Sequence, residues 1–146
     1  MHLELVSLIV HDYDEAVDFF TRALGFELVE DSPAVTTVGG RPKRWVVVRA
    51  PGARTGLLLA RADGSRQQAA VGDQHGGRVG FFLRVEDFEE RSRHLLAAGV
   101  RFLGEPRHEP YGTVAVFLDV AGNRWDLLGP ARPPEPAEPS EPAAAG

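Results

Sequence analysis

The chain has 146 residues, a length that predicts one domain with a sizeable hydrophobic core. It contains no cysteine, which excludes disulfides, thiolate metal sites and cysteine nucleophiles. The formal net charge is -5, with 16 Lys and Arg against 21 Asp and Glu, so we expect no nucleic acid partner. No apolar run approaches the ~20 residues that cross a bilayer, and the amino terminus lacks a secretory signal pattern. We therefore expect a cytoplasmic protein without a membrane partner.

The first part of the chain predicts a strand, a helix and three further strands. Residues 3–10 are apolar and strand-like. A helix is expected to begin at Asp12, whose carboxylate can accept from the first turn, with Glu15 three residues later. Gly25 suits a left-handed stop. The apolar stripe of the helix comprises Ala16, Val17, Phe20, Ala23 and Leu24. The strands that follow are expected at residues 26–31, 44–49 and 57–61.

The second part predicts the same order of elements after a linker. Residues 62–78 are rich in Gly, Gln and Ala and are expected to be a loop. A second helix is predicted to begin at Asp87, with Glu90 three residues later, and to stop at Gly99. Strands are predicted at residues 79–85, 100–103, 113–119 and 124–128.

The last segment, residues 130–146, is rich in Pro, Ala and Glu. Such a segment cannot bury enough apolar surface to offset its ordering entropy, so we predict a disordered tail.

An internal repeat relates the two parts. VSLIVHDYDE at residues 6–15 aligns with FFLRVEDFEE at 81–90. A repeat of this kind indicates one supersecondary unit used twice. We therefore predict an α+β fold in which two βαβββ modules form curled sheets around a concave pocket. Module one spans residues 1–61, the linker 62–78 and module two 79–129.

Two motifs resemble those of the vicinal oxygen chelate superfamily, which includes glyoxalase I, extradiol dioxygenases, fosfomycin-resistance enzymes and bleomycin-resistance proteins. VHDYDEAVDFF at residues 10–20, followed by ALGF at 23–26, is similar to the family's V-x-D-x-x-x-A/S-x-x-F-Y and L-G-F. FLDVAGNRWDL at 117–127 is similar to F-x-D-P-x-G-N-x-x-E-L. The resemblance covers residues 3–129. It implies the fold of two βαβββ modules and a homodimer whose pocket can lie between chains.

The resemblance also implies where a divalent metal would bind in an enzyme of this family. The four ligand positions fall on Leu5, Leu58, Gly80 and Asp126. Three of them carry no ligand atom, and Asp126 is one methylene shorter than the family's Glu. One carboxylate cannot hold a divalent ion that needs three or four protein donors. We expect no metal centre of the family type and no cofactor; the alternative is a displaced metal site built from His75, His108 and Asp126.

Strand alternation selects candidate residues for the pocket. For two of the aromatic candidates, Trp45 and Phe117, core packing is an equally open interpretation. Asp126 has three interpretations: a remnant metal ligand, a general base whose pKa is raised by burial, or an ion-pair partner of Arg44 or Arg84, which we favour. The basic run 41–44 could attract an anion, although such runs are usually solvated. The ligand-pocket candidates are Leu5, Ser7, Trp45, Leu58, Gly80, Phe82, Tyr111, Phe117 and Asp126.

Three functions follow as hypotheses. The first, which we favour, is a metal-free small-molecule-binding protein similar to the bleomycin-resistance branch, with a small-molecule ligand and a second copy of the chain as partners. The second is a glyoxalase-like lyase or dioxygenase with a displaced metal site, or with Asp126 as general base. The third is a non-catalytic interaction module whose working part is the acidic Pro-rich tail.

Overall fold

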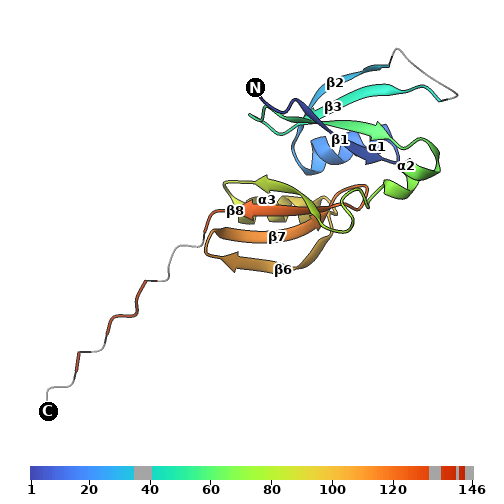
Figure 1. The fold of residues 1–146 in the computed structure, drawn as a ribbon. Helices are drawn as coiled ribbons and strands as arrows, with labels where there is room; N and C mark the ends of the chain where they lie inside the picture. The colour runs from blue at the N-terminus through green and yellow to red at the C-terminus, as the bar shows by residue number, and fades with distance from the viewer. Residues whose placement is uncertain (35–40, 132–135, 141, 144–146) are drawn as a thin grey trace.

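The computed structural model describes residues 1–34, 41–131, 136–140 and 142–143, and its helices and strands form two similar halves (Figure 1). The first half contains β1 (Leu5–Val10), α1 (Tyr13–Asp18), a π-helical turn η1 (Phe19–Ala23), β2 (Glu27–Pro33), β3 (Arg44–Arg49) and β4 (Gly56–Arg61). The linker carries α2 (Gly64–Ala70). The second half contains β5 (Val79–Arg84), α3 (Phe88–Ala97), β6 (Phe102–Glu109), β7 (Gly112–Leu118) and β8 (Arg124–Gly129).

Each half forms its own four-stranded sheet, and the two sheets have the same topology. The strand orders are β1-β4-β3-β2 and β5-β8-β7-β6. In each sheet the first strand pairs in parallel with the last, while the other neighbours are antiparallel. The sheets are curled but not closed. The predicted α+β fold of two βαβββ modules is confirmed.

The two main helices begin and end as their sequences predict. The carboxylate of Asp12 accepts the Glu15 N–H at 2.8 Å, and that of Asp87 accepts the Glu90 N–H at 3.0 Å. Gly25 (φ 73°) and Gly99 (φ 84°) take the left-handed conformation after the helices. One difference is that the first helix widens into η1 for its last turn, where the Thr21 hydroxyl donates to the Val17 carbonyl at 2.7 Å.

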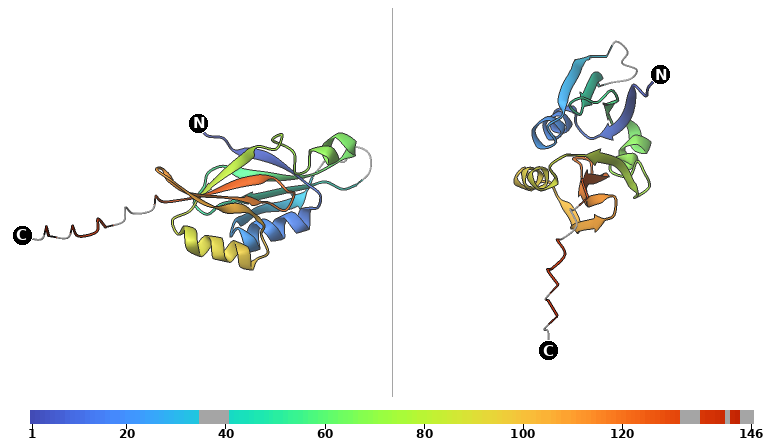
Figure 2. Two further views of the ribbon diagram at one scale, coloured as in Figure 1. Left: turned by 90° about the horizontal axis from the view of Figure 1, so that it is seen from below. Right: turned by 90° about the vertical axis from the view of Figure 1, so that its left-hand side faces the viewer.

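The two modules share one hydrophobic core, in which the indole of Trp125 is central. Its ring lies 4.4 Å from Phe81 and 5.7 Å from Phe117, both within module two. It also lies 5.8 Å from Phe20 and 6.2 Å from Phe26, which belong to module one. Figure 2 shows α1 and α3 side by side on the same side of the two sheets. The helix-facing surfaces are therefore filled, and the opposite face of each sheet is left open.

The linker differs from its prediction as a loop. Residues 64–70 form α2, a helix with no buried side chain. Gln and Ala have favourable helix propensity, so the segment forms a helix although glycines flank it. Beyond α2, the side-chain amide of Gln74 binds the outer edge of β1: Oε1 accepts the Ile9 N–H at 2.9 Å, and Nε2 donates to the Ser7 carbonyl at 2.7 Å. These two hydrogen bonds connect the linker to module one just before β5 begins.

The predicted tail, residues 130–146, falls partly outside the described residues, since 132–135, 141 and 144–146 are not described. Its described residues lie in no helix or strand. The predicted module boundaries and the disorder of the tail stay predictions. No helix in the described part of the chain is long and apolar enough to cross a membrane.

Candidate functional site

The face of each sheet opposite its helix is its open face, and strand alternation decides which side chains lie there. In module one, Leu8, Val46 and Leu59 are fully buried in the core. Their neighbours along the strands therefore point the other way. We call this set the first open face; it comprises Leu5, Ser7, Trp45, Val47 and Leu58. The centre of this face is apolar apart from the Ser7 hydroxyl, whereas Glu30 and Ser32 of β2 and Arg49 at the end of β3 lie on the same side at its margin.

The register of the first sheet brings these side chains together. Ser7 of β1 lies opposite Leu58 of β4, which in turn lies opposite Val47 of β3. Leu5 lies opposite Gly56, whose missing side chain leaves the Leu5 methyl groups against the backbone. Trp45 is 42% exposed although it belongs to a central strand. A large, half-exposed indole on this apolar surface is the composition of a ligand-binding wall.

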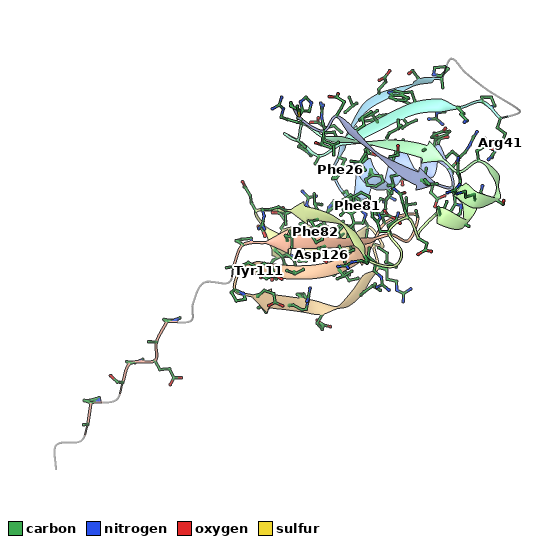
Figure 3. The ribbon with its side chains drawn as sticks, in the orientation of Figure 1. Phe26, Arg41, Phe81, Phe82, Tyr111 and Asp126 are labelled. Atoms are coloured by element: carbon green, nitrogen blue, oxygen red, sulfur yellow. The ribbon has the colours of Figure 1, made fainter. Side chains whose placement is uncertain are left out.

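The second open face is the equivalent surface of module two. It comprises Phe82, Leu103, Val116, Asp126 and Leu128. Phe82 lies opposite Asp126, Asp126 opposite Val116, and Val116 opposite Leu103. The Phe82 side chain is 64% exposed. Figure 3 shows Phe82 and Asp126 on the sheet of module two, while Phe26 and Phe81 lie between the modules.

The carboxylate of Asp126 has an unusual environment. Its Oδ1 atom is buried and has no hydrogen-bond partner in the described part of the chain. Burial raises the pKa of the Asp126 carboxyl above its ordinary value, and the positive charge of Arg107 offsets this by a smaller amount. The expected ion pair with Arg44 or Arg84 is wrong. Arg44 instead binds Asp14 and Asp31 on the surface, and the described residues show no ion pair of Asp126.

The positions where the family places metal ligands do not fit a metal. The paired register makes Leu58 the counterpart of Asp126, since each lies opposite the matching residue of the first strand of its module. At Gly80 an added methyl group would overlap the imidazole ring of His75, so the linker histidine fills the space of that missing side chain. Among the described residues, no group of three His, Asp or Glu side chains could hold a metal ion.

The displaced metal site is not supported either. The sequence predicts that His108 lies in a loop, but in the structure it belongs to β6. Its Nδ1 lies 3.2 Å from the Thr113 hydroxyl. The ring of His75 packs edge-on against Phe81 at 5.0 Å. His75, His108 and Asp126 therefore do not form a ligand set.

Two of the aromatic candidates lie away from the open faces. Phe117 is fully buried between Trp125 and Phe102, so the structure supports core packing, one of its two open interpretations, over a place in the pocket. Both alternating sets of β7 are apolar, and only the contact with the helix side decides which one is core. Tyr111 lies in the turn between β6 and β7 and is 63% exposed, at the rim of the second sheet.

Comparison with known proteins identifies the family of this chain. The family model described as "Glyoxalase/Bleomycin resistance protein/Dioxygenase superfamily" matches residues 2–127. The chain belongs to this superfamily. An uncharacterised protein of Shewanella frigidimarina is 46% identical over 124 residues, which cover 84% of this chain and 89% of the relative.

Two solved structures have a similar fold and a similar sequence. TnmS3 of Streptomyces sp. CB03234, described as an antibiotic binding protein, is 31% identical, with a TM-score of 0.70. The match covers 90% of this chain and 97% of TnmS3. A superfamily member from Sphaerobacter thermophilus is 27% identical, with a TM-score of 0.65 and coverage of 88% and 97%.

Proposed function

We propose that this protein binds a small, largely aromatic molecule on its open faces without a metal ion. The observation that carries the proposal is that three of the four positions where the family places metal ligands hold residues without a donor atom. Leu5, Leu58 and Gly80 offer no donor atom, and the surfaces around them carry exposed Trp45 and Phe82. Aromatic walls with few polar groups are the usual composition of small-molecule sites. The similarity to TnmS3, an antibiotic binding protein, supports this class of function.

The proposal includes a second copy of the chain. Each open face exposes a large aromatic side chain in a single chain, Trp45 on the first and Phe82 on the second. Exposed apolar surface of this kind is covered when two chains associate through these faces. A homodimer in which one chain covers the open face of another would enclose the ligand between them. Sedimentation velocity tests this part: we expect a dimer, and a monomer at all concentrations would contradict it.

Fluorescence titration tests the binding function. The probes are ANS (anilinonaphthalene sulfonate), Nile red and bleomycin, each added to the full chain with and without EDTA. We expect saturable binding of at least one probe, unchanged by EDTA, and weakened in the Trp45→Ala variant. Arg66→Gln on the exposed surface of α2 is the control variant. Failure of all three probes to saturate, or abolition of binding by EDTA, would overturn the proposal.

One observation favours a second candidate function, which is proton transfer by Asp126. A carboxyl with a buried, unpartnered oxygen and a raised pKa is suited to general acid–base chemistry. The test is turnover of the hemithioacetal of methylglyoxal and glutathione in the presence of EDTA. Turnover that falls at least about a hundredfold in Asp126→Asn supports this candidate. No turnover, or full turnover in the variant, rejects it.

A further inference from the structure

A hollow of about 410 Å³ lies at the end of the second open face, where the linker passes the beginnings of β6 and β8. Three arginines line it: Arg78 from the linker, Arg101 just before β6, and Arg124 at the start of β8. Asp73 is the acidic residue of the lining. A cationic hollow stands out in a chain whose net charge is -5.

The three arginines of the hollow form no ion pair among the described residues, although Asp73 also belongs to the lining. The one side-chain hydrogen bond found for them is from Arg124 Nη1 to the Gly77 carbonyl, at 3.1 Å. By contrast, Arg22 and Arg44 each bind an aspartate on the surface. The guanidinium groups of the hollow therefore keep most of their donors for another partner.

The ring of His75 forms part of the wall of the hollow. Its Nδ1 atom is buried without a hydrogen-bond partner in the described part of the chain, but it faces Gly80 of β5. The donors that the hollow offers to a ligand are therefore those of the three arginines.

The hollow continues the second open face. Arg124 lies opposite Leu118 in the sheet, and Asp126 opposite Val116, so both Arg124 and Asp126 point away from the core. Leu103 and Leu118 line the hollow, and Leu103 also belongs to the second open face. A molecule lying on Phe82 and Val116 can thus reach the arginines with one end.

We infer that the ligand carries an anionic group, a carboxylate, sulfonate or phosphate, which binds Arg78, Arg101 and Arg124 while its apolar part lies on the second open face. The inference rests on the proposed binding function and narrows its ligand class to amphiphilic anions. Arginine suits this role because its planar fork can donate two parallel hydrogen bonds to an anionic group.

A matched pair of probes tests the inference. ANS carries a sulfonate, whereas Nile red is neutral. In the double variant Arg78→Gln/Arg101→Gln, we expect ANS to bind about tenfold more weakly, the effect of losing charge-assisted hydrogen bonds. Nile red should bind within about twofold of the unmodified chain. The control, Arg66→Gln/Arg93→Gln, removes the same charge from the exposed surfaces of α2 and α3 and should leave both dyes unchanged.

The outcomes separate the two proposals. If both dyes bind and the double variant weakens neither or both alike, the inference is wrong and the binding function stands. If neither dye binds, the binding function fails, and a titration with inorganic sulfate followed by NMR of the arginine Nε–H groups decides the anion site. Saturable shifts at Arg78, Arg101 and Arg124 then support the site, and their absence rejects it.

Discussion

The first and second open faces have the same backbone and different chemistry. Both are formed by the face of a βαβββ sheet opposite its helix, in matching register. The centre of the first is Leu58 opposite Val47, and the centre of the second is Asp126 opposite Phe82. Both modules keep apolar residues on the face that packs in the core, although their identities differ, as at Leu57 and Trp125. They differ in polarity on the face that the core leaves free. In this chain the centre of the first open face is apolar, whereas the centre of the second carries Asp126 and its end is a cationic hollow.

The largest effect on stability is expected when the first open face is given the carboxylate that the second one has. Leu58→Glu places a carboxylate where Asp126 stands in module two, opposite Val47 at the apolar centre of the first open face. We expect a loss of about 2–4 kcal/mol in the free energy of unfolding, because the half-buried carboxylate loses solvation among apolar neighbours. Urea unfolding measures it. Leu58→Met is the control and should cost less than about 1.5 kcal/mol. Equal losses in the two variants would show that the face tolerates charge.

A smaller effect is expected at Gly80. Gly80→Ala adds a methyl group that overlaps the ring of His75. We expect a loss of about 1–2 kcal/mol in stability, from overpacking of the linker against β5. The double variant Gly80→Ala/His75→Ala should recover most of it, giving a coupling energy between the two sites. Additive losses in a thermal or urea unfolding cycle would mean that the two residues do not compete for one space.

The exposed aromatic residues should affect binding more than stability. Trp45→Ala and Phe82→Ala remove side chains that are 42% and 64% exposed, so each should change stability by less than about 1 kcal/mol. Each should weaken ANS by about three- to tenfold if both faces hold the ligand. Fluorescence titration measures the affinity. An effect confined to one of the two variants would show that one module alone binds the probe.

The smallest effect is expected from Asp126→Asn, and it depends on pH. The folded pKa of Asp126 is raised, so the native state holds this proton more tightly than the unfolded state does. The ionised carboxylate therefore lowers stability once the pH rises from the unfolded pKa through the folded one. The variant should gain at most about 1 kcal/mol at neutral pH, and the gain should vanish below the unfolded pKa. A gain that grows in acid would contradict the raised pKa.

Much of the fold could be predicted because it depends on local patterns. The two caps, the two glycine stops and the alternating strands are short-range features, and their repetition fixed the module topology. The prediction ended β6 too early because Gly104 and Pro106 interrupt the strand pattern; in the structure Gly104 has a φ of 78° and the pairing with β7 shifts there. Alternation alone handles this kind of irregularity poorly.

The site could be predicted only in part. The repeat and the family motifs predicted which residues stand at the family's metal-ligand positions. The contact between His75 and Gly80 could not be predicted, because it joins the linker to β5 through a turn that has no periodic pattern. The side of β7 that faces the core was undecided for Phe117 because Val114 and Val116 are as apolar as Ala115. The surroundings of Asp126 depend on where distant arginines lie, which no local pattern reveals.

The amide of Gln74 has a consequence for the exposed edge of the first sheet. β1 is an edge strand, and its unpaired N–H and C=O groups could template another strand. Gln74 donates to the Ser7 carbonyl and accepts from the Ile9 N–H, the two groups that a parallel neighbour would use. One side chain therefore acts as a single residue of a neighbouring strand and obstructs edge-to-edge aggregation at the centre of β1.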